Sequence, residues 1–226
     1  MMWGMPNPSS QPGRTGRPPK FSRAEILAAA RRVVEAEGVE RLTMRRLARE
    51  VGSTPMALYH HVRDKEELLV LLLDDYAATA VTRPPLPDDP RERIVVAATA
   101  MHDAVAGCAW VVEALTADDV LARSALWYTE QIVDAAVVCG LTPEQAAHAY
   151  RAIWYYTVGE VIVRAAAARR RADSGRPTYR ERVFAEIDPA ELPRLASMAD
   201  QWGPVTAEGT YVEGLRALVN GLLGGL

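Results

Sequence analysis

The sequence predicts an all-α fold, and three observations support that prediction. Alanine is abundant, alternating β-branched residues are scarce, and apolar residues recur mostly at the spacing of a helix. With 226 residues, the chain can bury a sizeable core and form one or two domains. We expect an N-terminal three-helix unit joined by a long helix to a larger C-terminal helical domain.

The first segment, residues 1–21, is rich in proline, glycine, serine and basic side chains. It contains almost nothing that could pack against a core, so we expect a disordered basic arm. The first helix should begin after Ser22, because Ser22 and Glu25 have the spacing of a capping box. An apolar stripe follows at helical spacing, and Gly38 should end this helix.

The next segment predicts two short helices joined by a tight turn. Thr43 is a natural N-cap for the first helix, and Gly52 stands where a helix end commonly turns left-handed. Thr54 then caps a second helix from Pro55 to Val62, with proline at the first helical position, where its missing N–H costs nothing. This pattern is typical of a helix-turn-helix, whose second helix lies in the major groove of DNA. The alternative is one more antiparallel helix pair in an all-helical protein.

Charge divides the chain into two unlike parts. Residues 1–65 carry 12 lysines and arginines against 6 aspartates and glutamates, a net charge of +6. Residues 66–226 carry 14 against 23, a net charge of −9. The basic part is the one that holds the helix-turn-helix, as phosphate binding requires, and the acidic part would repel DNA.

Capping signals place the remaining helices. We expect Asp64 and Glu67 to form a second capping box, which opens a helix over residues 65–82 that belongs to both parts of the molecule. Four prolines in residues 82–90 then break the chain. Nine or ten helices are expected in all. The later ones are at 90–106, 109–115, 119–139, 142–171 and 208–223, with a mobile loop at 172–192 that can include a short helical turn.

The sequence offers little for catalysis or metal binding. The four histidines form no metal-binding motif, and no motif for a nucleophile or a phosphate loop is present. Cys108 and Cys139 lie in apolar helical runs and are expected to be core thiols. The chain shows neither a hydrophobic signal segment nor an apolar run that could cross a membrane. We therefore expect a cytoplasmic protein with no enzyme activity, cofactor or metal.

Large amphipathic side chains gather beyond residue 100, on four separate expected helices. A ligand site in a helical bundle is built from apolar walls with a few polar groups that fix orientation. Tryptophan and tyrosine each bring a polar tip, and two flanking carboxylates would suit a cationic or hydroxylated ligand. An aromatic core with its carboxylates at the surface is the alternative. The candidate ligand-binding residues are Met101, His102, Trp110, Glu113, Trp127, Tyr128, Gln131, Trp154, Thr157 and Glu160.

One set of residues falls at fixed offsets around the helix-turn-helix: Leu42, Thr43, Arg45, Leu47, Ala48, Gly52, Leu58, Tyr59, His61, Val62, Lys65, Leu68 and Leu69. Over about residues 22–72, this set resembles the TetR family of bacterial transcriptional regulators. Residues 155–159 and 211–222 are similar to the last long helices of the tetracycline-repressor-like members. The resemblance implies a homodimer, in which helices 143–168 and 208–223 pair with those of the partner.

The resemblance also implies how the head would bind double-stranded DNA. Phosphates would be held by Thr43, Tyr59, His61 and Lys65, and bases would meet Arg45, Pro55, Met56, Ala57 and His60. Thr54, at the start of the reading helix, is a further candidate. Arg17 and Lys20 resemble the short basic arms that enter an A·T-rich minor groove, although a solvated tail without a defined contact is the alternative.

The combined prediction is a DNA-binding transcriptional regulator with a helix-turn-helix domain at residues 22–66 and a ligand-binding and dimerisation domain at 67–226. It is expected to act as a repressor that an unknown small-molecule effector releases from a palindromic operator. Two alternatives stay open. One is a DNA-organising or activating member of the same fold that needs no ligand, and the other is a helical enzyme.

Overall fold

The structure is a computed structural model that describes residues 21–117, 120–173 and 178–224. These residues form twelve α-helices, two short 3-10 helices and no strand, which confirms the all-α fold. The elements are α1 (Arg23–Glu37), η1 (Val39–Arg41), α2 (Met44–Glu50), α3 (Pro55–Tyr59), α4 (Lys65–Ala80), α5 (Pro90–Ala106), α6 (Ala109–Ala117), η2 (Arg123–Ala125), α7 (Leu126–Val138), α8 (Pro143–Asp173), α9 (Tyr179–Ala185), α10 (Pro193–Ala196), α11 (Trp202–Ala207) and α12 (Tyr211–Leu223).

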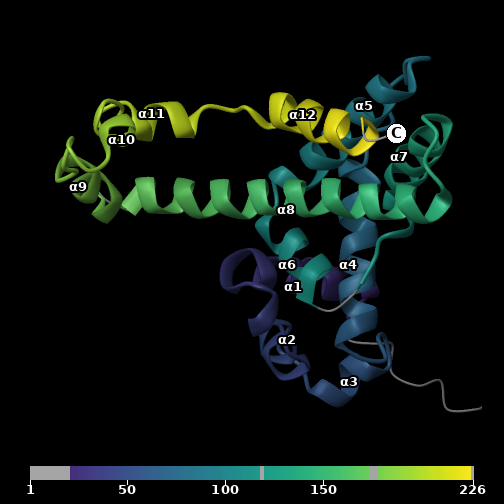
Figure 1. Cartoon of the computed structure of the whole chain (residues 1–226). Coiled ribbons are helices and arrows are strands. Elements are labelled where there is room, and N and C mark those ends of the chain that lie inside the picture. The colour runs from purple at the N-terminus through teal and green to yellow at the C-terminus, as the bar shows by residue number, and fades with distance from the viewer. Residues whose placement is uncertain (1–20, 118–119, 174–177, 225–226) are drawn as a thin grey trace, which may run out of the picture.

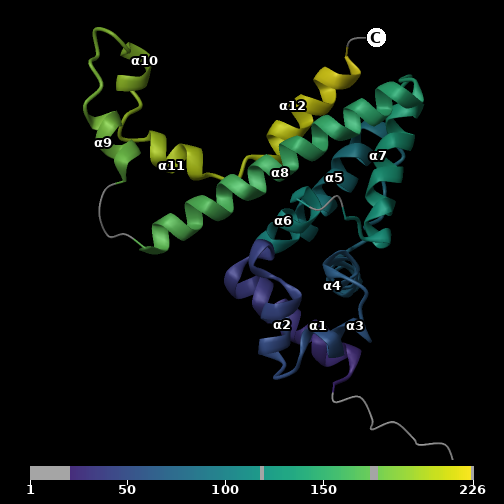
Figure 2. The same ribbon diagram turned by 90° about the horizontal axis from the view of Figure 1, so that it is seen from below.

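The molecule has a small head at one end and a helical body at the other. The head, residues 22–64, holds α1 to α3, and α4 runs from it into the body, which we define as α5 to α8 with α12 (Figure 1). The 31-residue helix α8 crosses the whole body, and α12 lies along its first half. A side arm, residues 178–207 with α9 to α11, sits at the far end of α8, away from the head and from α5 and α7 (Figures 1 and 2).

Local capping fixes where the helices of the head begin. Ser22 and Glu25 form the expected capping box, and the Thr43 hydroxyl accepts a hydrogen bond from the Arg46 N–H. Asp64 caps α4, as predicted, by accepting from the Glu67 N–H at 2.8 Å. The second capping box is nevertheless wrong, because the Glu67 carboxylate accepts from the N–H of Arg63 at 2.7 Å instead of reaching back to Asp64. This bond lowers the pKa of Glu67.

Several expected boundaries are corrected by the structure. Helix α3 ends at Tyr59 rather than at Val62, and α12 begins at Tyr211 rather than at residue 208. Helix α7 begins at Leu126 rather than at residue 119, because residues 120–122 run without helical structure and bury alternate side chains of the segment. The segment 172–192, expected as a loop that can include a short helical turn, contains the seven-residue helix α9. With α10 and α11, which follow it, the described residues form twelve helices rather than the nine or ten expected. The arm expected at residues 1–21 lies outside the described residues except for Phe21.

Two hydrophobic cores hold the described structure together. The first joins the head to α4 and α6, with Leu47 and Val112 among its buried residues, and reaches α5 and α8 at Val105 and Val161. The second joins α5, α7, α8 and α12 and includes Ile132 and Leu215. Because apolar burial is the main favourable contribution to folding, helices that share a core move together more readily than helices of different cores. Helix α6 therefore connects the two parts, because its buried residues lie in the first core while it also packs against α5 and α8.

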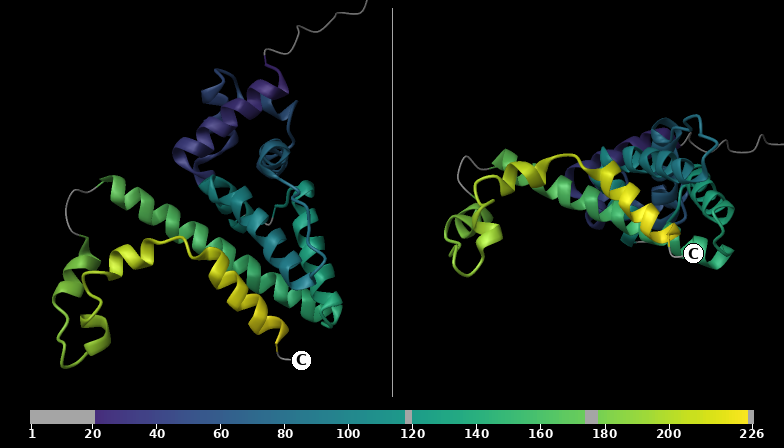
Figure 3. Two further views of the ribbon diagram at one scale, coloured as in Figure 1. Left: turned by 90° about the horizontal axis from the view of Figure 1, so that it is seen from above. Right: turned by 45° about the horizontal axis from the view of Figure 1, so that its top comes forward.

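Helix α12 is fixed against α8 by hydrogen bonds around Tyr211. The hydroxyl groups of Tyr211 and Thr157 lie 2.7 Å apart in the core, and the Tyr156 hydroxyl donates to the Tyr211 carbonyl at 3.1 Å. Burial raises the pKa of Tyr211, so its hydroxyl keeps its proton. Figure 3 shows the result from above and obliquely, with α12 alongside α8 and the side arm extending beyond both.

Within the described ranges, no single helix combines the length and hydropathy needed to cross a membrane. Helices α5 and α6 reach that hydropathy only as a pair, and the two are bent by 107° relative to each other.

Candidate functional site

The turn between α2 and α3 has the tight geometry that the sequence predicts. Gly52 adopts φ 61°, a left-handed conformation that glycine reaches at little cost. Ser53 donates its N–H to the Ala48 carbonyl at 2.8 Å and closes the end of α2. Thr54 then caps α3 by accepting from the Ala57 N–H at 3.4 Å. The two helices are thus held as a compact pair.

Helix α3 buries one side and presents the other to solvent. Leu58 and Val62 are 1% and 2% exposed and anchor the segment in the core of the head. Met56 is 71% exposed and Tyr59 is 48% exposed, which is unusual for side chains of this size. His60 is also exposed. The head therefore offers a surface of apolar and hydrogen-bonding groups on a helix that its own core does not use.

Basic and polar groups surround that helix. Arg45 is exposed on α2, His61 follows α3, and Lys65 stands in the first turn of α4. Arg46 is different, because its guanidinium lies 2.6 Å from Glu37 and 2.9 Å from Glu50 and lowers the pKa of both carboxyls. It therefore braces α2 against α1. Arg17 and Lys20, the two arm residues expected at DNA, lie outside the described residues.

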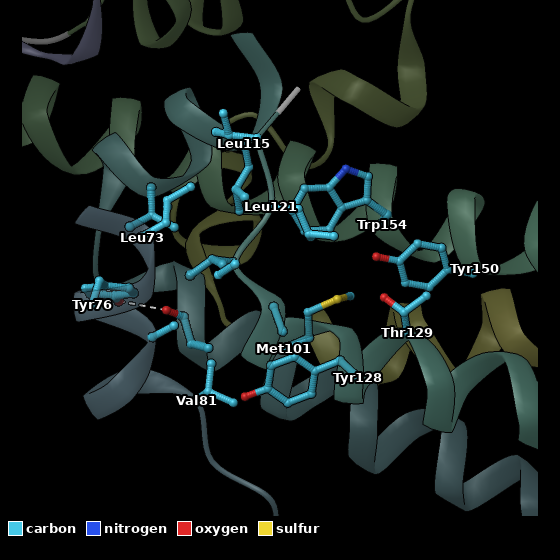
Figure 4. Close-up of a pocket in the computed structure, with 17 residues that line it drawn as sticks. Leu73, Tyr76, Val81, Met101, Leu115, Leu121, Tyr128, Thr129, Tyr150 and Trp154 are labelled. Carbon is cyan, nitrogen blue, oxygen red and sulfur yellow. Dashed lines mark hydrogen bonds between the residues drawn. The ribbon is translucent and has the colours of Figure 1, made fainter. Parts of the chain in front are cut away.

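A cavity of about 330 Å³ lies between α4 and the body. This volume falls at the low end of the range for small-molecule sites, about 300–1,000 Å³. Figure 4 shows side chains from α4, α5, α7 and α8 facing one another across it. Its lining consists of Leu73, Tyr76, Ala77, Val81, Met101, Ala104, Val105, Val111, Leu115, Val120, Leu121, Ala122, Ala125, Tyr128, Thr129, Tyr150 and Trp154.

The cavity sits at the seam between the two cores. Leu73, Ala77 and Val111 belong to the core shared by the head, α4 and α6. Met101 and Tyr128 belong to the core of the body. A molecule that fills the cavity would therefore touch residues of both cores.

Two tyrosines join α4 to the body at the edge of this cavity. The Tyr76 hydroxyl donates to the Ala104 carbonyl at 2.7 Å, and the Tyr128 hydroxyl accepts from the Thr82 N–H at 3.1 Å. Burial raises the pKa of both phenols, so both remain neutral at ordinary pH. These bonds fix the C-terminal half of α4 against α5 and α7.

The structure brings only some of the predicted ligand-binding residues to the cavity. Met101, Tyr128 and Trp154 line it. The other seven lie outside the lining: His102, Trp110, Glu113, Trp127, Gln131, Thr157 and Glu160.

Those seven residues mostly have other partners. His102 lies 2.9 Å from the Glu160 carboxylate and stacks on Tyr211. Thr157 bonds to Tyr211, as described above, and Trp110 packs edge-on against Tyr76. The sequence expectation missed the part of the wall that α4 and residues 120–125 supply. No local signal could have shown it, because the apolar residues of α4 look alike whether they face a core or a cavity.

Glu113 joins the body to the head instead of lining the cavity. Its carboxylate accepts from the Val39 N–H at 3.2 Å, just beyond the turn that Gly38 makes with φ 84°. The neighbouring residues Val111 and Leu115 of the same helix face the cavity. Helix α6 thus touches the cavity on one side and the head on the other.

Across the described ranges, no group of three or more histidine, cysteine, aspartate or glutamate side chains lies close enough to hold a metal ion. What the two regions offer is recognition. One is an exposed, basic helix-turn-helix surface, and the other is an apolar cavity between two rigid parts.

Two protein-family models match the chain. The model for bacterial regulatory proteins of the tetR family matches residues 26–72, which hold the helices of the head and the start of α4. The model for the tetracyclin repressor-like C-terminal domain matches residues 83–224, which is more than half of the chain.

Individual proteins resemble the head in sequence and the whole chain in fold. The HTH-type transcriptional repressor DrrR1 of Streptomyces coeruleorubidus is 44% identical over 59 residues, which are 26% of this chain and 22% of that protein. The chain therefore spans only about a fifth of the length of this curated relative.

Two solved structures share the fold over most of both chains. The TetR family protein ActR of Streptomyces coelicolor, in complex with (S)-DNPA, has a TM-score of 0.67 at 23% identity, covering 91% of this chain and 98% of that one. BioQ with its double-stranded DNA operator has a TM-score of 0.59 at 25% identity, covering 91% and 99%.

Proposed function

The chain belongs to the TetR family of bacterial regulatory proteins, and from that premise we propose that it is a repressor that leaves its operator when a small molecule enters the cavity. The family makes it a DNA-binding transcriptional regulator. The observation that supports release by a ligand is the cavity at the seam between the two cores. A ligand-independent regulator of this fold would be expected to fill that space with its own side chains.

DNA would be bound by the exposed side of α3 and the polar groups around it. Met56, Ala57 and His60, with Arg45 and Pro55, are proposed to meet bases, and Thr43, Tyr59, His61 and Lys65 to hold phosphates. Thr54 would mainly cap α3, since its hydroxyl already accepts from Ala57. We propose residues 22–66 as the DNA-binding domain and 67–226 as the ligand and dimer domain. The operator bound to BioQ supports this use of the fold.

A homodimer would place two reading helices on one face of the duplex. Successive major grooves lie about 34–36 Å apart, so one head alone cannot read both halves of a palindrome. The outer side of α8 supports pairing, because Tyr155 and Val163 are each 65% exposed there. Apolar side chains exposed this fully along one helix are typical of an interface with a second chain.

Release would follow from a change at the seam. A ligand among Leu73, Tyr76 and Met101 would push α4 from the body, and α4 carries Lys65 at its other end. To switch nearly all molecules, the ligand must prefer the released state by about 5.5 kcal/mol. That (S)-DNPA is bound by ActR supports a small organic effector for this fold.

Operator preference tests the proposed division of roles on α3. Selection from randomised operators should give altered base preferences for Met56→Ala and His60→Ala, because these side chains would touch base edges. Tyr59→Ala should weaken binding to every sequence by a similar factor, since a phosphate contact carries no base information. Equal loss of preference in all three variants would contradict the assignment.

Glu113 is expected to transmit part of the ligand signal, because it ties α6 to the head at Val39. The inducer lowers operator affinity by a certain factor. In Glu113→Ala that factor should be about twofold to thirtyfold smaller, which is the usual range for residues along a coupling route. Ligand affinity measured without DNA should change little. The two titrations, with and without operator, separate coupling from binding.

The matched control for this test is Glu113→Gln, which keeps an oxygen that can accept from the Val39 N–H. It should retain most of the coupling. If the glutamine and alanine variants lose coupling equally, the hydrogen bond to the head is not the transmitting contact.

A further inference from the structure

The described lining of the cavity contains no side chain that is charged at neutral pH. We propose that the cavity takes a neutral ligand with an apolar body and one hydroxyl or carbonyl group, held between Thr129 and Tyr150. The inference rests on the proposed function only in treating this cavity as the effector site. The expected ligands are aromatic or alicyclic alcohols and ketones, and ionised molecules do not belong to this class.

The acidic side chains that the sequence pointed to are occupied elsewhere. Glu160 lies 2.9 Å from His102 and 3.2 Å from Arg164. Glu113 binds the head at Val39. Neither carboxylate lines the cavity, so neither can neutralise a cationic ligand there. When an ion moves from water into an apolar cavity without a counter-charge, it loses hydration free energy. This loss is far larger than the free energy gained by burying its apolar part.

The hydroxyl groups that line the cavity differ in whether they already have a hydrogen-bond partner. Tyr76 and Tyr128 use their hydroxyls to join α4 to the body, at 2.7 Å from Ala104 and 3.1 Å from Thr82. Thr129 and Tyr150 have no hydrogen-bond partner for their hydroxyls within the part of the chain that the structure describes. A hydroxyl can both donate and accept, so this pair suits a neutral hydroxyl or carbonyl.

These two hydroxyls belong to the wall of the cavity that α7 and α8 form. Figure 4 shows them beside Trp154 and directed towards the interior, while Leu73 and Val81 face them from the opposite side. The cavity therefore has an apolar end on α4 and a hydrogen-bonding end between α7 and α8. A ligand with its polar group at one end would satisfy both, and its apolar part would rest on the helix that carries Lys65.

Four probes with one ring system test this inference: 2-naphthalenemethanol, 2-methylnaphthalene, 2-naphthoate and 2-naphthylmethylammonium. Equilibrium dialysis with the full chain at pH 7 measures each affinity. The alcohol should bind at least tenfold more tightly than the anion and the cation. Binding of either ion within threefold of the alcohol overturns the inference, and so does an alcohol that shows no binding at its solubility limit.

Two isosteric replacements test the polar end. Thr129→Val with Tyr150→Phe removes both hydroxyls and should weaken the alcohol about fivefold to tenfold, a typical loss for one or two neutral hydrogen bonds. The hydrocarbon should bind the variant no more weakly than it binds the original chain. The matched control, Thr79→Val with Tyr179→Phe, removes the same groups from exposed positions outside the cavity. Equal affinity of the alcohol for variant and control overturns the assignment of the two hydroxyls.

Operator release is measured separately by gel shift with the alcohol present. If the dialysis results hold and the operator stays bound, the proposed switch fails and the ligand class stands. If another molecule releases the operator while the alcohol fails in dialysis, the ligand class fails and the switch stands.

Discussion

Replacing Ala104 and Ala125 by leucine is expected to lower the affinity for 2-naphthalenemethanol about a hundredfold and to keep the protein on its operator in the presence of inducer. Both alanines line the cavity of about 330 Å³, one on α5 and one at the end of η2, just before α7. Leucines there would occupy the space that the ring system needs. Losing the burial of a side-chain-sized apolar group costs about 2–3 kcal/mol, which corresponds to about a hundredfold in affinity. Equilibrium dialysis and gel shifts measure the two effects.

The control for this variant places leucine at two exposed alanines, Ala106 on α5 and Ala147 on α8. It adds the same carbon atoms outside the cavity and should bind the alcohol like the original chain. If the variant with leucine at positions 104 and 125 still binds the alcohol normally, the ligand lies elsewhere. Without inducer, the variant with leucine at positions 104 and 125 should bind the operator within a few-fold of the original chain, since the leucines fill the cavity rather than displace α4.

The head was predictable because its signals are local. Ser22 with Glu25, Thr43 with Arg46, and the glycine at 52 each act within four residues, so the sequence alone contains both partners of each interaction. Sequence spacing also gave the exposed and buried sides of α3, since Leu58 and Val62 are four residues apart. The extent of α3 was overestimated, because a sequence pattern gives the ends of a helix less reliably than its position. The capping box expected at Asp64 was half right, since Asp64 caps α4 but Glu67 binds the Arg63 N–H.

The cavity was only partly predictable because its walls come from distant segments. Met101, Tyr128 and Trp154 were found from their size and amphipathic character, and all three line it. Glu113 and Glu160 were chosen by the same reasoning and lie elsewhere, because their partners, Val39 and His102, are 74 and 58 residues away. A pairing over that distance leaves no periodic trace in the sequence.

The two hydrophobic cores meet at the cavity. Helix α6 contacts α5 and α8 of the body, yet its buried residues belong to the core that the head shares with α4. The cavity lies between these two cores, so we propose that a ligand filling it would change the angle between them rather than compress either core. Hydrogen bonds of Tyr76 and Tyr128 cross this seam, at α4 and at the segment that follows α4.

Replacing Lys65 by glutamine is expected to weaken binding to every duplex, with the same factor for operator and random DNA. Lys65 stands in the first turn of α4, where backbone N–H groups and the ammonium can converge on one phosphate. A dimer that loses two phosphate contacts should show a slope of log affinity against log salt that is smaller by about 1.8. At 0.15 M salt that change corresponds to roughly a thirtyfold loss of affinity. Salt titrations of gel-shift affinity measure the slope directly.

The control for Lys65→Gln must remove one positive charge from a position that lies far from the DNA. Arg194→Gln does so on α10 of the side arm, at the far end of α8 from the body (Figure 1). Its slope should match that of the original chain, because the screening length at this salt is only about 8 Å. A change of slope shared by both variants would mean that net charge, rather than a phosphate at the start of α4, governs binding. A change confined to Lys65 would place that phosphate on the one helix that also forms a wall of the cavity, where ligand and DNA would compete for its position.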